Sequence, residues 1–206
     1  MATQQSIDAK ETTRVEAFSD GVFAIAVTLL VLEVKVPHVP EQAPASLLWR
    51  ELARQWPSYI ALISSFFTVL IMWTNHHSIF KMIVSTNSRF MFANGFLLLM
   101  VSLVPFPTAL IAEYIQAESA SVACAVYAGM FVIIAFAYSL LWEVALRSKL
   151  VSSTIPAPVI RATSRNGVVG ITAYAVATAA AFFSPYLSLG ICTALWLFWG
   201  FTMSQD

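Results

Sequence analysis

Residues 14–37 read RVEAFSDGVFAIAVTLLVLEVKVP, and this stretch decides the fold because a long apolar run follows a short polar segment. A helix needs about 20 mostly apolar residues to cross the hydrocarbon core of a bilayer. The run 15–36 is long enough, and so are three further runs, at 59–80, 90–111 and 120–144. The sequence therefore predicts an all-α, multi-pass membrane protein.

The C-terminal region, residues 168–203, is apolar except for Ser184, Pro185 and Tyr186 near its middle. Proline can end one helix and begin another, so we expect a tight helical hairpin with spans at about 166–183 and 186–203. Each arm is close to the minimum spanning length, and a single tilted or re-entrant segment is the alternative. The prediction is six transmembrane helices, with five as the alternative, in one transmembrane domain over residues 1–206.

The composition is typical of a membrane protein, because 59% of residues are hydrophobic and 11% are charged, against about a quarter charged in soluble proteins. The expected surroundings are a lipid bilayer. Eleven basic residues balance eleven acidic ones, so no basic stripe is available for nucleic acid, and we expect no such partner. Cys124 and Cys192 are isolated in apolar runs, so we expect neither a disulfide framework nor a metal site.

The basic residues divide unevenly between the two sides of a six-span chain. One side carries Lys10, Arg14, Lys81, Arg89, Arg147, Lys149, Arg161 and Arg165. The other carries only Lys35, Arg50 and Arg54, the last two on a predicted short amphipathic helix that includes Leu48 and Trp56. The positive-inside rule then places both termini in the cytoplasm, in a protein of the cell membrane.

The first span contains an intramembrane carboxylate. Asp20 lies more than one turn inside the apolar helix, where an ionised side chain is costly without a partner, so we expect a polar neighbour. The alternative is that Asp20 and Ser19 only lie at the headgroup level near the helix N-terminus. At about 100° per residue, Asp20 points away from a narrow arc that contains Ile25, Leu29 and Leu32. This arc could line a pore, although an aliphatic stripe is ordinarily lipid-facing or packed.

Several motifs give the sequence a family resemblance. Arg14, Phe18, Ser19 and Asp20 form an Arg-x-x-x-Phe-Ser-Asp signature, and GVFAIAVTLLVL follows it. Further motifs are Trp73-Thr-Asn-His76-His77 at the end of the second span, Asn94 in the third, and Pro105-Phe-Pro-Thr108 in its far half. With these, the chain resembles the endolysosomal potassium channels of the transmembrane protein 175 type, in the form of their prokaryotic homologues. The motifs cover roughly the first half of the chain.

The resemblance implies a homotetramer of six-span subunits around a central pore for monovalent cations, with potassium as the permeant ion and no cofactor. Prokaryotic members are expected to be less potassium-selective than their animal relatives. The pore positions that it implies are Ile25, Thr28, Leu29 and Leu32, with Ile25 at the narrowest ring and Thr28 as a hydroxyl layer.

The resemblance also implies a polar network that ties the first span to the second. Its positions are Arg14, Phe18, Ser19, Asp20, Trp73, His76, His77 and Asn94. Within it we expect His76 or His77 to hold Asp20. Successive helical residues point about 100° apart, so only one of the two histidines should face the first span. Without the family, these side chains would be read as ordinary helix–helix hydrogen bonds or as interfacial groups.

The resemblance implies a cation channel. Because no stretch resembles the TVGYG loop of the familiar potassium filter, we expect selectivity to arise differently, at a hydrophobic constriction. A narrow aliphatic ring would strip hydration from sodium at greater cost than from potassium, and could also close by dewetting. Glu33 at the outer mouth could contribute to cation preference. An alternative is a proton-coupled or proton-permeable transporter that uses Asp20 with His76 or His77. An enzyme is not expected, since the spans lack a nucleophile with a base or a metal cluster.

Overall fold

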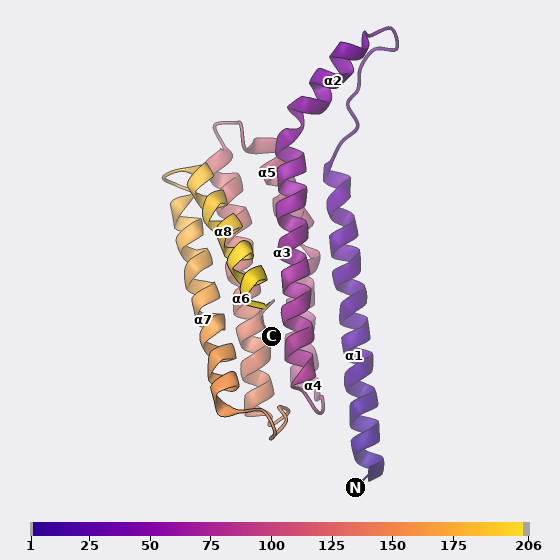
Figure 1. Cartoon of the computed structure of the whole chain (residues 1–206), viewed down its shortest axis with the longest axis vertical. Helices are drawn as coiled ribbons and strands as arrows, with labels where there is room; N and C mark the ends of the chain where they lie inside the picture. Colours follow the sequence, from indigo (N-terminus) through magenta and orange to yellow (C-terminus); the bar gives the residue numbers. More distant parts are fainter. Residues whose placement is uncertain (1, 204–206) are drawn as a thin grey trace.

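The computed structural model describes the backbone of residues 2–203 and the side chains of residues 10–200. Within this range the chain is helical, with a single isolated β-bridge between two loops. The helices in order are α1 (Ala2–Leu29), the 3-10 turn η1 (Leu30–Glu33), α2 (Ala45–Arg54), α3 (Trp56–Lys81), α4 (Ser88–Ser102), α5 (Pro105–Tyr114), α6 (Ala120–Arg147), α7 (Ala157–Ala180) and α8 (Pro185–Met203). Figure 1 shows them as an elongated bundle.

Four helical segments of the described chain are long and apolar enough to cross a membrane. They are Lys10–Glu33, Trp56–Lys81, Ser88–Tyr114 and Ala120–Arg147. These segments confirm the four predicted apolar runs. The two C-terminal helices do not meet the same criterion, and the apolar part of α8, Pro185–Gly200, is shorter.

The predicted break at Ser184-Pro185-Tyr186 is confirmed, because α7 ends at Ala180 and α8 begins at Pro185. The helix that carries the predicted span at about 166–183 extends beyond that span at its N-terminal end. It begins at Ala157, directly after Pro156, and its first turns carry Arg161 and Arg165 on exposed positions. Arginines exclude a segment from an apolar run but do not end a helix.

The third apolar segment is divided at Pro105 into two helices. α4 ends at Ser102 and α5 begins at Pro105, whose ring nitrogen cannot donate to the preceding turn. The buried hydroxyl of Thr108 donates to the carbonyl of Val104 at 2.9 Å beside this break. Thr108 also lies 2.8 Å from the hydroxyl of Ser65, which joins α5 to α3 inside the bundle.

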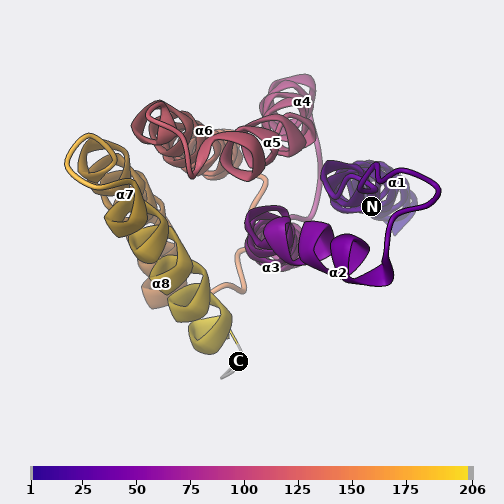
Figure 2. The ribbon, with the colours of Figure 1, turned by 90° about the horizontal axis from the view of Figure 1, so that it is seen from above.

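The helices pack with α6 in the interior and α1 at one edge. α6 contacts α4, α5, α7 and α8, whereas α1 packs mainly against α3 and α4. The view from above places α1 at the side of the bundle opposite to α7 and α8 (Figure 2). The face of α1 that points away from α3 and α4 therefore has no main packing partner among the described residues.

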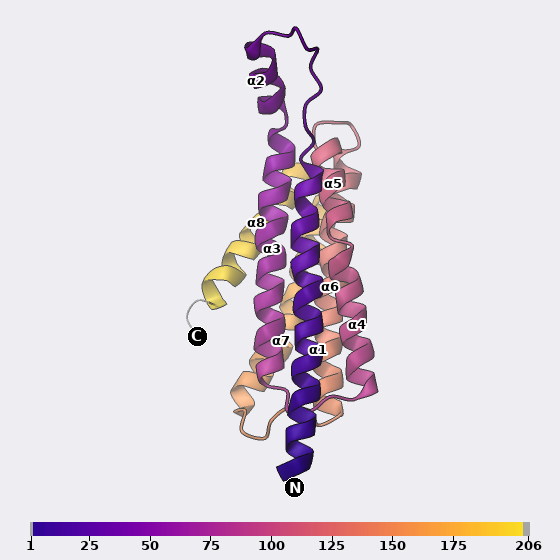
Figure 3. The same cartoon turned by 90° about the vertical axis from the view of Figure 1, so that its right-hand side faces the viewer.

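The helix α2 projects beyond the bundle at the end opposite the N-terminus (Figure 3), and it packs mainly against α3. Its charged side chains pair with each other, because Arg54 donates to Glu51 at 3.2 Å. Leu48 and Trp49 are exposed, with Trp49 at 72%. The predicted amphipathic helix is confirmed as a helix, and its place at a membrane interface stays a prediction.

Candidate functional site

α1 has one buried face and one exposed face. From Ser19 to Leu30 at the start of η1, the buried side chains are spaced four, three and four residues apart, as expected for one side of a helix against two neighbours, and they are Ser19, Phe23, Ala26 and Leu30. The predicted pore positions lie on other sides. Ile25 is 60% exposed, Leu29 40% and Leu32 69%. The structure thus groups these aliphatic residues on an unpartnered face of α1.

Thr28 is exposed on the same helix. Its hydroxyl donates a hydrogen bond to the carbonyl of Ile25 at 2.9 Å, one turn earlier. The hydroxyl proton is therefore used within the helix, while the oxygen still has lone pairs that can accept. An exposed oxygen of this kind can face a cation.

Two polar contacts connect α1 to the last turns of α3. The indole nitrogen Nε1 of Trp73 donates to Asp20 Oδ1 at 2.8 Å. One turn lower, Nδ1 of His77 donates to Glu16 Oε1 at 2.8 Å. Glu16 and Asp20 are four residues apart, and so are Trp73 and His77, whose rings stack at 5.9 Å with an interplanar angle of 12°. The antiparallel helices are thus joined by two parallel contacts, which we call the α1–α3 anchor.

A second polar chain runs through the interior from α3 to α4 and back to α1. Nε2 of His76 donates to Asn94 Oδ1 at 2.9 Å, and Asn94 Nδ2 donates to the hydroxyl of Ser19 at 2.9 Å. Ser19 in turn donates to the carbonyl of Val15 at 2.9 Å. His76, Asn94 and Ser19 are all buried. This order of donors requires a proton on Nε2 of His76, whose ring packs 5.3 Å from that of Phe23.

The predicted histidine partner of Asp20 is wrong, because Asp20 is held by Trp73. The expectation that the two histidines face different ways is confirmed, since His77 contacts α1 and His76 contacts α4. The reason is the 100° step between successive residues, which puts Trp73 and His77 on one face of α3 and turns His76 toward α4.

Two predicted network residues lie elsewhere. Arg14 is exposed and forms no side-chain hydrogen bond or ion pair with the described residues, and Phe18 is 68% exposed on the open side of α1. Residue type and spacing in a signature do not fix which side of the helix its members occupy. Glu16, by contrast, belongs to the anchor although the sequence interpretation omitted it. The signal for it was its position four residues before Asp20, on the same helix face.

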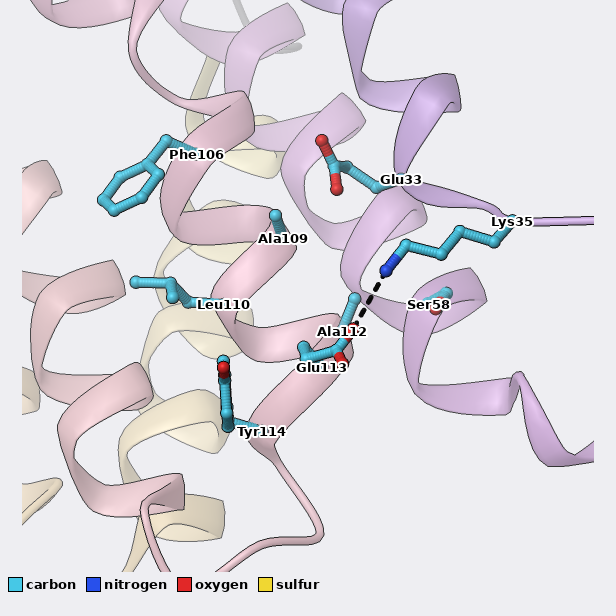
Figure 4. Close-up of a pocket in the computed structure, with 9 residues that line it drawn as sticks. All are labelled: Glu33, Lys35, Ser58, Phe106, Ala109, Leu110, Ala112, Glu113 and Tyr114. Atoms are coloured by element: carbon cyan, nitrogen blue, oxygen red, sulfur yellow. Dashed lines mark hydrogen bonds and ion pairs between the residues drawn. The ribbon is translucent and has the colours of Figure 1, made fainter.

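The opposite end of α1 is tied to α5. Lys35 Nζ donates to Glu113 Oε2 at 3.0 Å, across a surface hollow of about 210 Å³ that Glu33, Ser58 and Tyr114 also line (Figure 4). The hydrogen bond to Glu113 and its negative charge raise the pKa of Lys35 above its ordinary value. Lys35 therefore remains positively charged at neutral pH, and Glu33 is left without an ion-pair partner among the described residues.

The contacts described above do not assemble the groups that would make or break a covalent bond. Among the residues whose side chains are described, no group of three or more His, Cys, Asp and Glu could hold a metal ion. The buried cysteines Cys124 and Cys192 are free thiols. The anchor and the interior chain instead fix the rotation of α1 about its own axis, which sets where Ile25, Leu29 and Leu32 point.

Comparison with known proteins gives consistent matches over nearly the whole chain. A family model described as "Endosomal/lysosomal potassium channel TMEM175" matches residues 14–105, the range that holds α1 from Arg14 onward, the anchor and Asn94. A potassium channel of Chamaesiphon minutus is 45% identical over 186 residues, which are 90% of this chain and 91% of the relative. A potassium channel of Streptomyces collinus is 43% identical, and the match covers 93% of this chain and 92% of that relative.

A solved structure agrees with these sequence matches. It is the crystal structure of a lysosomal potassium-selective channel TMEM175 homolog from Chamaesiphon minutus. The two chains superpose with a TM-score of 0.84 at 42% sequence identity, and the match covers 94% of this chain and 98% of the solved one. An animal protein is more distant. The endosomal/lysosomal proton channel TMEM175 of Gallus gallus is 32% identical over 143 residues, which are 63% of this chain and 28% of that protein.

Proposed function

The chain belongs to the TMEM175 family, and on this premise we propose that it is a potassium-conducting cation channel whose pore is lined by α1. The relatives that are named as potassium channels match it from end to end, whereas the animal proteins named as proton channels match part of it. The observation that carries the proposal is the division of α1 into a polar, anchored face and an aliphatic, unpartnered face.

The pore forms between copies of the chain. One α1 helix cannot enclose a pathway, and the sequence has no internal repeat that could supply a second one, so rotational copies are the simplest source. We propose a homotetramer in which the four copies of Ile25, Leu29 and Leu32 surround the axis. The support is that these three side chains point away from the subunit that carries them.

Ion choice in this pore would come from dehydration. A ring of Ile25 side chains offers no polar group, so an ion passes only after losing most of its water, which costs sodium more than potassium. Just beyond this ring, the oxygen of Thr28 can replace part of the lost hydration, because its proton is already donated to the Ile25 carbonyl. Filter and gate would then lie within the same turns of α1.

The subunit would cross the membrane six times, with α7 and α8 as the last two spans. Both termini would lie in the cytoplasm of a cell membrane, because eight of the eleven basic residues gather at the N-terminal end of the bundle. α8 is tilted in Figure 3, so as the final span it would need the bilayer to thin around it or its flanking residues to reach the interface.

A second candidate is proton conduction, which the names of the animal relatives favour. Glu16, His77 and Asp20 could exchange protons near one end of α1. Above Asp20, however, α1 offers no titratable side chain until Glu33. A proton path through α1 would thus need water along the aliphatic face, and this makes potassium the better-supported ion.

The test is reconstitution of the purified protein into liposomes that hold a potassium gradient, with a voltage-sensitive dye as reporter. A channel will set a membrane potential that follows the potassium gradient at constant pH. A coupled transporter will instead give a potential that collapses when the pH gradient is clamped, and that result would overturn the proposal. Bi-ionic reversal potentials in planar bilayers then give the potassium-to-sodium ratio.

A further inference from the structure

Two loops meet at the end of the bundle that carries the N-terminus. The loop after α3 (residues 82–84) and the loop after α6 (residues 150–152) form an antiparallel bridge, and we call these residues the loop joint. Two backbone hydrogen bonds of 2.9 Å hold it, from Val84 N–H to the Leu150 carbonyl and from Ser152 N–H to the Met82 carbonyl. Since Ile83 and Leu150 are buried, the two loops form a single packed unit.

Three exposed cations lie close to the loop joint along the chain. Lys81 is the last residue of α3, Arg89 lies in the first turn of α4, and Lys149 directly precedes the joint. None of them forms an ion pair within the described part of the chain, whereas Arg147 nearby is bound by Glu143 at 2.6 Å. The joint therefore carries three uncompensated positive charges.

In a membrane, these cations would lie at the depth of the lipid headgroups. Lys81 ends one membrane-length segment and Arg89 lies at the start of the next. Lys149 has a φ of 56°, a backbone conformation that favours glycine, and yet the position holds a long cationic side chain. Basic side chains just outside a span attract anionic headgroups, with a strength that salt screens.

The same cations are close to the α1–α3 anchor. Lys81 lies four residues after His77, on the same face of α3, and His77 holds Glu16 of α1. A ligand on the loop joint therefore restrains the end of α3 that positions the pore helix.

We propose that Lys81, Arg89 and Lys149 bind the phosphate headgroups of anionic phospholipids, and that this contact stabilises the α1–α3 anchor and favours conduction. The binding step stands on the charges and geometry of the joint. Its effect on current rests on the proposed channel function.

The binding test uses the full-length protein in neutral detergent, with added phosphatidylglycerol or phosphatidylcholine and the melting temperature as readout. A ligand of the native state raises this temperature. We expect a rise with phosphatidylglycerol that disappears at high salt, and no rise with phosphatidylcholine. Lys81→Gln/Arg89→Gln should lower the apparent affinity for phosphatidylglycerol about 30-fold, since each headgroup cation contributes about fivefold.

The matched control is Arg161→Gln/Arg165→Gln, which removes two exposed arginines at the same end of the bundle but on α7. This variant should show the same rise in melting temperature with phosphatidylglycerol as the wild type. An equal loss in both variants would mean diffuse attraction to the whole end, and an equal rise with inorganic phosphate would mean a phosphate site; either result overturns the proposal. So does a wild-type protein that melts at the same temperature with both lipids.

The coupling to conduction is tested separately by potassium flux in liposomes with and without phosphatidylglycerol. We expect a larger flux with the anionic lipid for the wild type and no such increment for Lys81→Gln/Arg89→Gln. Equal flux in both membranes overturns the coupling. A protein that conducts no potassium in any lipid refutes the proposed function, while the melting experiment still decides whether the joint binds lipid.

Discussion

At Ile25 the side chain stands clear of its own subunit, and the turn that carries it also presents the Thr28 hydroxyl oxygen. If a ring of Ile25 forces dehydration, Ile25→Asn should let a hydrated ion pass. We expect a larger current and a potassium-to-sodium permeability ratio that falls toward one, read from bi-ionic reversal potentials. Leu29→Asn should act more weakly.

Thr28→Val is the matched control for that variant, because it removes the hydroxyl and keeps the shape and the helix. If Ile25→Asn kept the wild-type potassium-to-sodium permeability ratio while Thr28→Val lost its preference for potassium, selectivity would belong to the hydroxyl layer. That result would refute the aliphatic filter.

The contact between Asp20 and Trp73 predicts a structural effect rather than a change in ion choice. Trp73→Phe keeps an aromatic ring against His77 but removes the donor, so Asp20 loses its partner. Asp20→Ala removes the acceptor. Each variant should lower the yield of assembled oligomer and its melting temperature, and the pair should show a coupling energy of about 0.5–3 kcal/mol in a double-mutant cycle.

The permeability ratio should stay unchanged in any of these anchor variants that still conduct. Additive effects of the two substitutions would show that the hydrogen bond contributes nothing. A changed ratio would place Asp20 in the permeation pathway.

For single residues, the sequence predicted which side chains take part in polar contacts between helices, but it did not predict how they pair. Ser19, Asp20, Trp73, His76, His77 and Asn94 all enter polar contacts between helices. The pairing depends on how α3 is rotated against α1, and that rotation follows from packing over the whole helix. An apolar run gives no information about such a rotation when it is hydrophobic on every side.

At the scale of elements, α6 and α7 approach each other closely at Gly167. A Cβ on Gly167 would lie 2.4 Å from the hydroxyl oxygen of Ser139 and 3.4 Å from its Cβ, so the two helices meet where glycine leaves room. Gly167→Ala should force them apart and destabilise the protein by about 1–3 kcal/mol, as overpacking does. The measurement is the melting temperature in detergent.

Gly170→Ala is the control, since its Cβ would meet Ala135 at an ordinary 3.6 Å. The double variant Gly167→Ala/Ser139→Ala should recover part of the loss because the nearest atom is gone. Equal melting temperatures for the two glycine variants would contradict a close contact at residue 167.

Element boundaries were predictable where backbone chemistry sets them and not elsewhere. Pro105 and Pro185 lack a donor, and helices begin at both. The start of α7 was missed because Arg161 and Arg165 interrupt the hydrophobic signal without interrupting the helix. Hydropathy reports the solvent around a segment, whereas helix length follows from its hydrogen bonds and its capping residues.

For the whole molecule, the main prediction is that the chain crosses the membrane six times with both ends inside. The uncertain span is α8, whose 19 residues extend over about 28 Å, against a hydrocarbon core of about 30 Å. Its tilt in Figure 3 shortens it further along the bundle axis. A short helix can still span when the bilayer thins around it or when flanking residues reach the interface.

Reporter fusions decide the count. Gln116 lies between α5 and α6, and Ser153 lies between α6 and α7; Gln205 lies outside the described residues. With six spans, Gln116 should report the outside, and Ser153 and Gln205 should both report the cytoplasm. The distribution of lysine and arginine requires Ser153 to be inside whatever α8 does, so this fusion is the internal control. Opposite sides for Ser153 and Gln205 would mean five spans, with α7 and α8 crossing only once between them.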